Sequence, residues 1–404
     1  MTIPRSESQL RVLHVNAGNM YGGIERALTT FAQYRCSNPG LVQEFAICFE
    51  GRQADELREA GVDSHLLGKV RFSRPWTVSA ARARFLGLLK SRSFDVVLTH
   101  AGWCQSLVGQ VARRAGVRLV NYVHGPFGSR SWFHRLVSNV PPDCYIANSE
   151  YTARQIRAAV RTPVYLVHPP VQNRLPLDEQ ETRASIRREL GASESDKVIL
   201  HVGRLESLKG HSVLIKAAKL LPQDRPWRVW IAGGPQSAEQ EKYLNDLRNE
   251  VRRLELARRI LFLGERNDVP RLMSSADVYC QPNTAPESFG LSIVEALQAG
   301  LPVVTSDIGG AREILSPGIG FFTTAGDVHG VAKSLTKLLE TSPSKQEIQA
   351  RQARAEWLTS PERQLQRLHS ALLADADHVG TKGLDRESTA VTVQEGTPGR
   401  AVVA

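Results

Sequence analysis

The sequence has no stretch of about 20 uninterrupted apolar residues, and its first ten residues (MTIPRSESQL) are too polar for a signal peptide. Its five cysteines lie far apart without a CxxC pair, and three fall inside apolar runs, so we expect buried free thiols rather than disulfides or zinc ligands. Hydrophobic residues make up 42% and charged residues 23%, which excludes wholesale disorder and fibrous repeats. The sequence therefore predicts a folded cytoplasmic protein.

Apolar runs rich in Val, Leu and Ile alternate with helical stretches, which is typical of parallel sheets flanked by helices. A length of 404 residues favours two or three domains, and the runs come in two sets. The expected strands are 11–16, 44–49, 94–100, 118–124, 144–149 and 164–168, then 197–203, 228–232, 260–263, 277–281, 302–306 and 320–323. The predicted fold class is α/β, with two Rossmann-like, doubly wound parallel-sheet domains.

A polar, proline-bearing stretch at 168–181 (HPPVQNRLPLDEQE) separates the two sets and has the composition of a linker. A helical region follows from about 331 to 374, with an interruption near Thr359-Ser360-Pro361. Because such sheets bind ligands at the carboxyl ends of their strands, we expect the active site in a cleft between the domains. The predicted boundaries are an N-terminal domain at 11–170, a linker at 171–182, a second domain at 183–350, C-terminal helices packing back toward the first domain at 351–374, and disordered ends at 1–10 and 375–404.

The densest signal is the segment ESFGLSIVEALQAG at 287–300. A loop with Glu287 and Gly290 opens into a helix whose first N–H groups are unpaired and whose dipole favours an anion. Glu295 lies inside that helix, where its carboxylate can accept two hydrogen bonds from a vicinal diol such as ribose. Alone, Glu295 fits a solvated helix residue better; together with Glu287 and the glycine loop, it favours sugar binding.

Two further loops carry groups suited to phosphate. Arg204 and Lys209 lie in HVGRLESLKG, where a strand empties into a loop, and their charges suit a diphosphate whose leaving charge must be stabilised. In NAGNMYGGIE, Gly22 and Gly23 follow the first strand and can bring backbone N–H groups against a phosphate. This loop is not the GxGxxG dinucleotide fingerprint.

The motifs GGIE, VHGP, ANSEYT, GRLESLKG, AGGP and ESFGLSIVE, in this order, resemble the retaining glycosyltransferases of family four, which have the GT-B fold. The resemblance runs from about Arg11 to Leu372, although the linker reads VHPPVQ where many relatives carry an IPNGVD-like stretch. It implies that Glu295 holds the donor ribose. It further implies that the transferred sugar is held by Glu287, with Ser288 and the backbone at Phe289, Gly290 and Leu291. Arg204 and Lys209 would clamp the diphosphate, with Gly22 and Gly23 closing over it from the first domain. The resemblance also places His124 of VHGP beside the reacting sugar carbon, and Arg266 in Gly264-Glu265-Arg266 against the base.

The activity that the resemblance implies is transfer from a UDP- or GDP-linked sugar, with retained anomeric configuration, to a hydroxyl of a saccharide, lipid-linked or small-molecule acceptor. Cell-surface polysaccharide or glycolipid synthesis is the expected setting. The leaving phosphate helps to deprotonate the acceptor, so no protein nucleophile, cofactor or metal is expected. One alternative is a nucleotide-sugar epimerase or a phosphorylase of the same fold, although the sequence pattern of the epimerases lacks the paired acids. The other is a catalytically silent sugar-binding relative.

The net charge of +10 belongs to the first part of the chain, since residues 1–170 hold 21 Lys and Arg against 11 Asp and Glu. Within it, Arg71 to Arg92 and Arg130 to Arg135 mix cations with Trp and Phe. Two interpretations stay open: a surface that lies on anionic lipid head groups, making the protein peripheral on the inner face of the membrane, and a solvated face around an anionic acceptor. Nucleic-acid binding is not expected, because no binding module accompanies the charge.

Overall fold

The structure is a computed structural model that describes residues 9–18, 22–125, 127, 140–316 and 318–374. Three predicted features lie outside the described residues: most of the disordered N-terminus (1–8), the disordered tail (375–404) and the basic segment from Arg130 to Arg135. The predicted disorder of residues 1–10 is wrong at residue 10. Leu10 already pairs with Leu41 in a strand, because an apolar side chain there can join the sheet.

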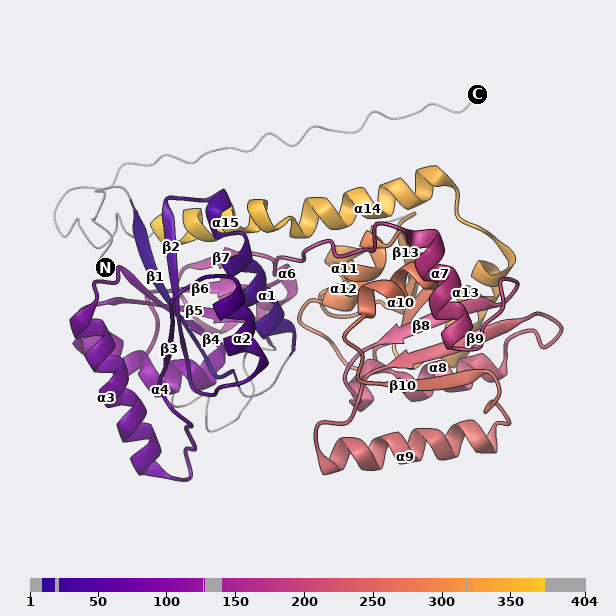
Figure 1. Cartoon of the computed structure of the whole chain (residues 1–404), viewed down its shortest axis with the longest axis horizontal. Coiled ribbons are helices and arrows are strands. Elements are labelled where there is room, and N and C mark those ends of the chain that lie inside the picture. Colours follow the sequence, from indigo (N-terminus) through magenta and orange to yellow (C-terminus); the bar gives the residue numbers. More distant parts are fainter. Residues whose placement is uncertain (1–8, 19–21, 126, 128–139, 317, 375–404) are drawn as a thin grey trace.

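The first domain is built on a seven-stranded parallel sheet in the order β3-β2-β1-β4-β5-β6-β7 (Figure 1). The chain runs outward from β1 on one side and from β4 on the other, so the switch point lies between β1 and β4, where such sheets bind ligands. The strands are β1 (Leu10–Asn16), β2 (Leu41–Ile47), β3 (Ser64–Leu66), β4 (Val96–His100), β5 (Arg118–Val123), β6 (Cys144–Ala147) and β7 (Val164–Leu166).

Helices cover both faces of this sheet, and buried residues of the strands pack against them in several apolar clusters. Strands β1, β4, β5 and β6 are buried along nearly their whole length, as parallel strands covered on both faces must be. The helices are α1 (Gly23–Gln33), α2 (Arg52–Glu59), α3 (Pro75–Ser91), α4 (Ala101–Arg114) and α6 (Glu150–Ala159), with a 3-10 turn at Arg35–Ser37.

The second domain repeats this plan in a six-stranded parallel sheet ordered β10-β9-β8-β11-β12-β13, with its switch point between β8 and β11. Its strands are β8 (Lys197–Val202), β9 (Trp227–Ala232), β10 (Ile260–Gly264), β11 (Val278–Gln281), β12 (Val303–Ser306) and β13 (Gly320–Thr323). Its helices are α7 (Glu179–Glu189), α8 (His211–Lys219), α9 (Ala238–Arg253), α10 (Val269–Ser275), α11 (Leu291–Gln298), α12 (Ala311–Ile314) and α13 (Val328–Glu340), with a 3-10 turn at Ser207–Lys209. The predicted α/β class with two doubly wound sheets is confirmed.

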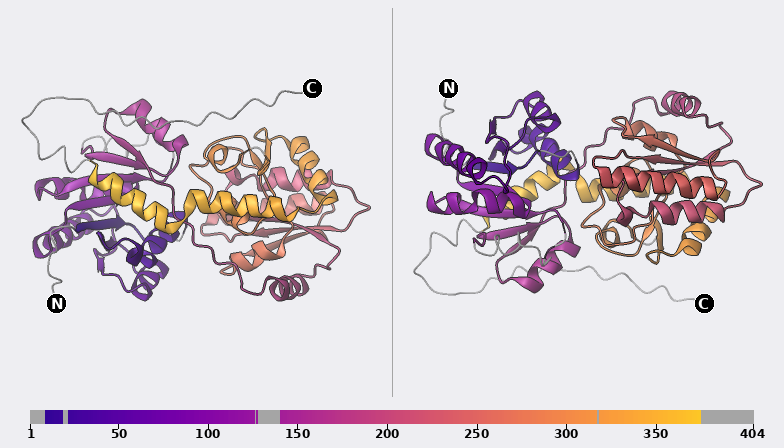
Figure 2. Two further views of the ribbon diagram at one scale, coloured as in Figure 1. Left: turned by 90° about the horizontal axis from the view of Figure 1, so that it is seen from above. Right: turned by 90° about the horizontal axis from the view of Figure 1, so that it is seen from below.

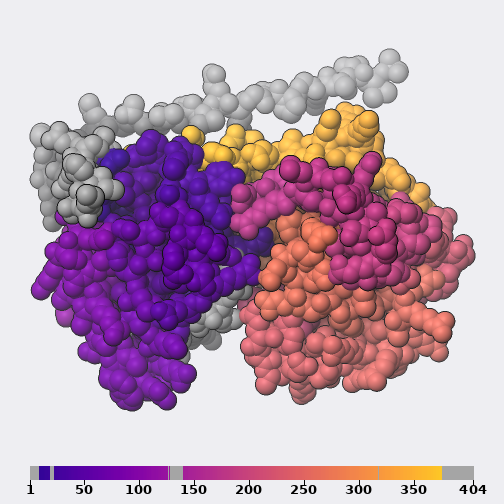
Figure 3. Space-filling view, in the orientation of Figure 1, coloured from indigo at the N-terminus to yellow at the C-terminus, as the bar shows by residue number. Residues whose placement is uncertain are grey.

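The last two helices, α14 (Lys345–Thr359) and α15 (Pro361–Leu373), run along one edge of both domains (Figures 1 and 2). Ala355 and Leu358 of α14 belong to the second domain's core, whereas Leu365 and Leu368 of α15 belong to the first domain's core. The surface is hollowed between the domains on the opposite side (Figure 3). The chain therefore returns to the first domain at Ser360, where the interruption was predicted.

Two predicted boundaries need correction, and one strand was not predicted. The boundary at 350 falls inside α14, and the helical region is also broken at 341–344, where the sequence TSPS disfavours helix. The linker ends at residue 178, because Asp178 caps α7 by accepting from the Glu181 N–H at 2.8 Å. Strand β3 was not predicted, since Ser64–Leu66 is short and largely exposed and therefore carries no apolar run.

All five cysteines are free. Cys48, Cys104, Cys144 and Cys280 are buried as predicted, whereas the prediction is wrong for Cys36, which is exposed in the 3-10 turn at Arg35–Ser37. Within the described ranges, no helix combines the length and the apolar character needed to cross a bilayer.

Candidate functional site

The three loops predicted from the sequence to bind phosphate or sugar all follow strands at the two switch points. The Gly22-Gly23 loop follows β1, the loop with Lys209 follows β8, and the loop with Glu287 follows β11. Because both sheets present the carboxyl ends of these strands toward the domain interface, the loops meet there. The fold thus brings together segments that lie up to about 270 residues apart.

Lys209 and Glu287 form a largely buried ion pair, with 10% and 21% of their side-chain surfaces exposed. Lys209 Nζ contacts Glu287 Oε1, while Glu287 Oε2 accepts from Gln281 Nε2 at 2.8 Å and Asn283 Nδ2 at 3.2 Å. Burial alone would raise the pKa of Glu287, but the Lys209 charge and these donors outweigh it and lower the pKa. Glu287 is therefore a carboxylate that holds an ammonium group in place beside the helix α11 N-terminus.

Gly210 sets the distance between these two loops. Its φ is +75°, and a Cβ there would lie 1.8 Å from the carbonyl oxygen of Pro282. Only glycine fits a left-handed backbone at such close approach. The Lys209 loop can therefore press directly on the loop that carries Glu287.

We expect Gly210→Ala to lower the free energy of unfolding by clearly more than the about 1–2 kcal/mol that a left-handed alanine costs, because the Pro282 loop must also move. Gly191→Ala is the matched control, with φ +67° and open space around its Cβ position. Urea unfolding of both variants gives the comparison. Equal losses would show that the contact with Pro282 carries no cost.

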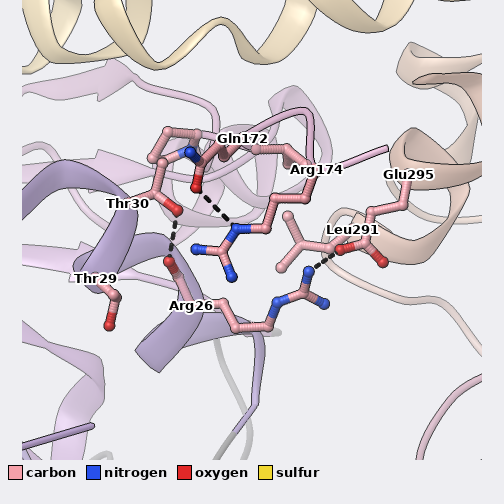
Figure 4. Close-up of a pocket in the computed structure, with 9 residues that line it drawn as sticks. Arg26, Thr29, Thr30, Gln172, Arg174, Leu291 and Glu295 are labelled. Carbon is pink, nitrogen blue, oxygen red and sulfur yellow. Dashed lines mark hydrogen bonds and ion pairs between the residues drawn. The ribbon is translucent and has the colours of Figure 1, made fainter. Parts of the chain in front are cut away.

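Glu295 lies at the other end of the interface, inside α11, and only 9% of its surface is exposed. Its Oε1 pairs with Arg26 Nη2 of α1 in the first domain, and its Oε2 is buried without a hydrogen-bond partner. Figure 4 shows the two side chains pointing toward one another beside Leu291 and Arg174, in a pocket that both domains line. Arg174 makes its described hydrogen bonds to Gln172 and Gln33. Glu295 therefore keeps one buried carboxylate oxygen without a hydrogen-bond donor beside this pocket.

The Gly22-Gly23 loop touches α11 directly. A Cβ on Gly23 would lie 2.8 Å from Leu291 Cδ1, so glycine permits this close contact between the domains. Glu25 holds the loop by accepting from the Gly22 N–H and from Asn16 Nδ2, each at 3.0 Å. Burial raises the pKa of Glu25.

His124 joins the domains through its backbone. Its carbonyl oxygen accepts from Ser288 Oγ at 2.7 Å and from Asn148 Nδ2 at 3.3 Å, and its ring stacks on Tyr122; the residue as a whole is half-buried. Burial lowers the pKa of His124 to about 3, so the ring is neutral at pH 7. His124 and Ser288, predicted separately, are thus neighbours.

The remaining predicted residues are placed less centrally. Arg204 pairs with Glu206 at 2.8 Å, although its charge also acts on Glu25 across the interface. Arg266 donates to both oxygens of Asp268 at 2.8 Å and to Glu189, so its guanidinium is held by acids of its own domain. The Phe289 side chain is buried in the core, which leaves only its backbone for a ligand, and Gly290, with φ +120°, precedes the first turn of α11.

Sequence reasoning missed four side chains of the site: Arg26, Asn148, Gln281 and Asn283. Gln281 and Asn283 stand at the carboxyl end of a predicted strand, which is a usable signal. Arg26 gave none, because its partner lies 269 residues away.

The predicted basic surface is only partly free. Arg71, Arg74 and Trp76 are exposed near the start of α3, and Trp76 is 67% exposed. By contrast, Arg82 and Arg84 donate to backbone carbonyl oxygens. Among the described residues, no cluster of three His, Cys, Asp or Glu side chains could hold a metal ion, and the absence of a metal stays a prediction.

Two family models divide the chain between them. Residues 21–173 match "Glycosyltransferase Family 4", and residues 182–356 match "Glycosyl transferases group 1". The D-inositol 3-phosphate glycosyltransferase of Corynebacterium urealyticum is 37% identical over 210 residues, which cover 50% of this chain and 47% of that protein. The N-acetyl-alpha-D-glucosaminyl L-malate synthase of Bacillus anthracis is 28% identical over 157 residues, covering 38% and 39%. The chain thus spans about half the length, or less, of these curated relatives.

Among solved structures, the Anabaena protein HepE in complex with UDP and glucose superposes with a TM-score of 0.79 at 23% identity, covering 91% of this chain and 100% of that one. This likeness bears on the fold. The two doubly wound sheets, the loops at their switch points and the two family models all indicate the same fold. The chain belongs to the group 1, family 4 glycosyltransferases and has their GT-B fold.

Proposed function

We propose that the chain transfers a sugar from a nucleotide-diphospho-sugar, UDP- or GDP-linked, to a hydroxyl of a saccharide, lipid-linked or small-molecule acceptor, with retained anomeric configuration. The observation that carries the proposal is the unpartnered oxygen of Glu295 in a pocket lined by both domains. A buried carboxylate oxygen without a donor is costly, and a ribose hydroxyl would supply one.

In this proposal, different side chains and backbone groups bind different parts of the nucleotide-sugar donor. Glu295 binds the ribose, and the backbone N–H groups at the start of α11 and at Gly23 face the diphosphate and sugar, while the Gly22 N–H stays bound to Glu25. Lys209 lies beside Glu287 at the interface, where its charge can stabilise the leaving diphosphate. Arg266 reaches the base only if its guanidinium leaves Asp268.

Glu287 and Glu295 are not expected to act like the two carboxyl groups of a retaining glycosidase, which lie about 5 Å apart on either side of the glycosidic bond. Glu287 is occupied by Lys209, and Glu295 by Arg26. Catalysis then rests on positioning and charge stabilisation, with the leaving phosphate taking the acceptor proton.

The comparisons support UDP as the first donor to test, because HepE has been crystallised with UDP and with UDP-glucose. The names of the curated relatives refer to inositol 3-phosphate and malate, which are small anions. The basic surplus of residues 1–170 suits such an acceptor, and it equally suits an anionic lipid acceptor at a membrane surface near Arg71, Arg74 and Trp76.

The test is release of UDP or GDP from a panel of nucleotide sugars, with and without polyol phosphates, hydroxy acids, saccharides and lipid-linked saccharides. We expect one donor to release its nucleotide only with a matching acceptor, and the product's anomeric coupling in NMR to match that of the donor. An inverted product would refute retention. Conversion of the sugar without any acceptor would favour the epimerase alternative.

A further inference from the structure

A row of three histidines crosses the first sheet and ends at the domain interface. His14 of β1, His100 at the end of β4 and His124 after β5 lie on adjacent strands. His14 Nδ1 lies 3.0 Å from His100 Nε2, and His100 Nδ1 lies 2.9 Å from His124 Nε2. Each ring therefore hydrogen-bonds to the next through one nitrogen.

The inner end of the row meets Gln43 of β2. Gln43 Nε2 donates to the Phe31 carbonyl oxygen at 3.4 Å, which fixes the amide so that Oε1 is its remaining acceptor. Gln43 Oε1 and His14 Nε2 are both buried without a hydrogen bond of normal geometry in the described structure. Gln43 lies opposite Val12 in the register of β1 and β2, so its side chain shares a face of the sheet with His14 on the neighbouring strand. Burial lowers the pKa of His14 to about 3, and Gln43 acts against that shift.

An amide oxygen and a ring nitrogen are complementary only when the nitrogen carries the proton. His14 Nε2 is then N–H, so His14 Nδ1 is an acceptor and His100 Nε2 must donate to it. By the same rule His100 Nδ1 accepts from His124 Nε2–H. A neutral imidazole has one proton, and therefore the Nδ1 of His124 is left with a lone pair.

The opposite order would place a lone pair of His14 against the Gln43 oxygen in the core, where neither has another described donor. Burial keeps all three rings neutral at pH 7, since it lowers the pKa of each. Ala101, with φ +66°, directly follows His100, and Asn121 Nδ2 donates to Thr99 Oγ1 at 2.9 Å beside this turn. An alanine in the left-handed region is strained, and such strain often marks functional positions.

We propose that Gln43, His14 and His100 are positioning residues that fix the tautomer of His124, so that its Nδ1 accepts a hydrogen bond from a hydroxyl of the bound sugar. The last clause rests on the proposed function, and the tautomer itself does not. No described residue hydrogen-bonds to His124 Nδ1, and His124 as a residue is half-buried. The backbone of His124 is fixed against Ser288 of the donor loop.

The direct test is ¹⁵N-histidine NMR of the full chain without ligand at pH 7, with assignment by His14→Gln, His100→Gln and His124→Gln. Long-range ¹H–¹⁵N correlations show which ring nitrogen carries the proton. We expect Nε2–H at His14, His100 and His124. Nδ1–H at His124 in the unaltered protein would overturn the proposal whether or not any variant folds.

Gln43→Leu removes the acceptor that orders the row, whereas Gln43→Glu keeps one. We expect His124 to take up Nδ1–H at least partly in Gln43→Leu and to keep Nε2–H in Gln43→Glu. Ile47→Val on the same strand is the packing control and should leave the tautomer unchanged. An unaltered His124 in Gln43→Leu would overturn the positioning role.

Kinetics separate this inference from the proposed function. Gln43→Leu should lower kcat about tenfold, the equivalent of one hydrogen bond to the sugar, and leave UDP affinity unchanged, because UDP carries no sugar. Unchanged kcat in a variant with an altered tautomer would refute the contact with sugar. A wild type that neither binds a nucleotide nor turns over would refute the proposed function while the NMR result stands.

Discussion

Replacement of Lys209 by methionine is expected to lower transfer by about 10²–10³-fold. The reason is that Lys209 is largely buried beside Glu287, where its charge is little screened and acts strongly on a developing phosphate charge. Nucleotide affinity should fall less, since Glu295 and the backbone donors remain. Steady-state kinetics with the identified donor, together with the Kd of its nucleoside diphosphate, measure both effects.

Two further variants separate chemistry from folding in that experiment. Lys209→Met alone leaves the Glu287 charge without its partner, which costs about 3–5 kcal/mol for a buried pair. The double change Lys209→Met with Glu287→Gln should recover much of that stability and remain inactive. Lys216→Met on α8 is the surface control, because Lys216 is half exposed and 3.6 Å from Glu250. Activity near wild type in the folded Lys209→Met variant would rule out the proposed role.

Acidification is expected to destabilise the protein steeply below pH 6.5. Burial lowers the pKa of six described histidines below the ordinary value of 6.5, less for His369 and more for the other five: His14, His100, His124, His201 and His211. Below pH 6.5 the unfolded chain therefore binds protons that the folded chain does not, and stability falls as pH falls. The loss approaches about 1 kcal/mol for each histidine between pH 6.5 and 5.5, or on the order of 5 kcal/mol in total.

Carboxyl groups do not account for this window. The pKa values of Glu44 and Glu287 are lowered from 4.5, so their contribution is lost only below about pH 4.5, and the raised pKa of Glu25 acts in the opposite direction. Urea unfolding at pH 7.5 and 5.5 measures the effect. His211→Leu should make the dependence shallower by one proton, since burial lowers the pKa of this histidine well below its ordinary value. A free energy of unfolding that stays constant over this range would contradict the prediction.

The sequence was a good guide to the second sheet, whose strands lie within a residue or so of the predicted ranges. Buried parallel strands are continuous apolar runs bounded by Gly, Pro or Asp, which makes them visible. Strand β3 carries no such run because it is an exposed edge. The interruption between the last two helices was predicted correctly near Ser360. Only the packing of the structure, however, shows that α14 belongs to the second domain.

The site could be predicted only as far as its local motifs reached. Glu287, Glu295 and Lys209 lie in loops with recognisable spacing, and the structure brings them to one interface. The partners that fix them come from far along the chain, as Arg26 and Asn148 do, and no local pattern announces such a pair. His14 and His100, which look like ordinary core residues in the sequence, gain a candidate role only from their alignment across adjacent strands.

If a nucleoside diphosphate binds at Glu295, thermal-shift measurements with UDP, GDP, ADP and NAD will detect it. A ligand at about one hundred times its Kd adds about 2.7 kcal/mol of stability, so a true partner stands out. We predict stabilisation by one nucleoside diphosphate, lost in Glu295→Gln and retained in Glu239→Gln, the same change at an exposed position of α9. Stabilisation that persists in Glu295→Gln, or stabilisation by NAD alone, would contradict the account.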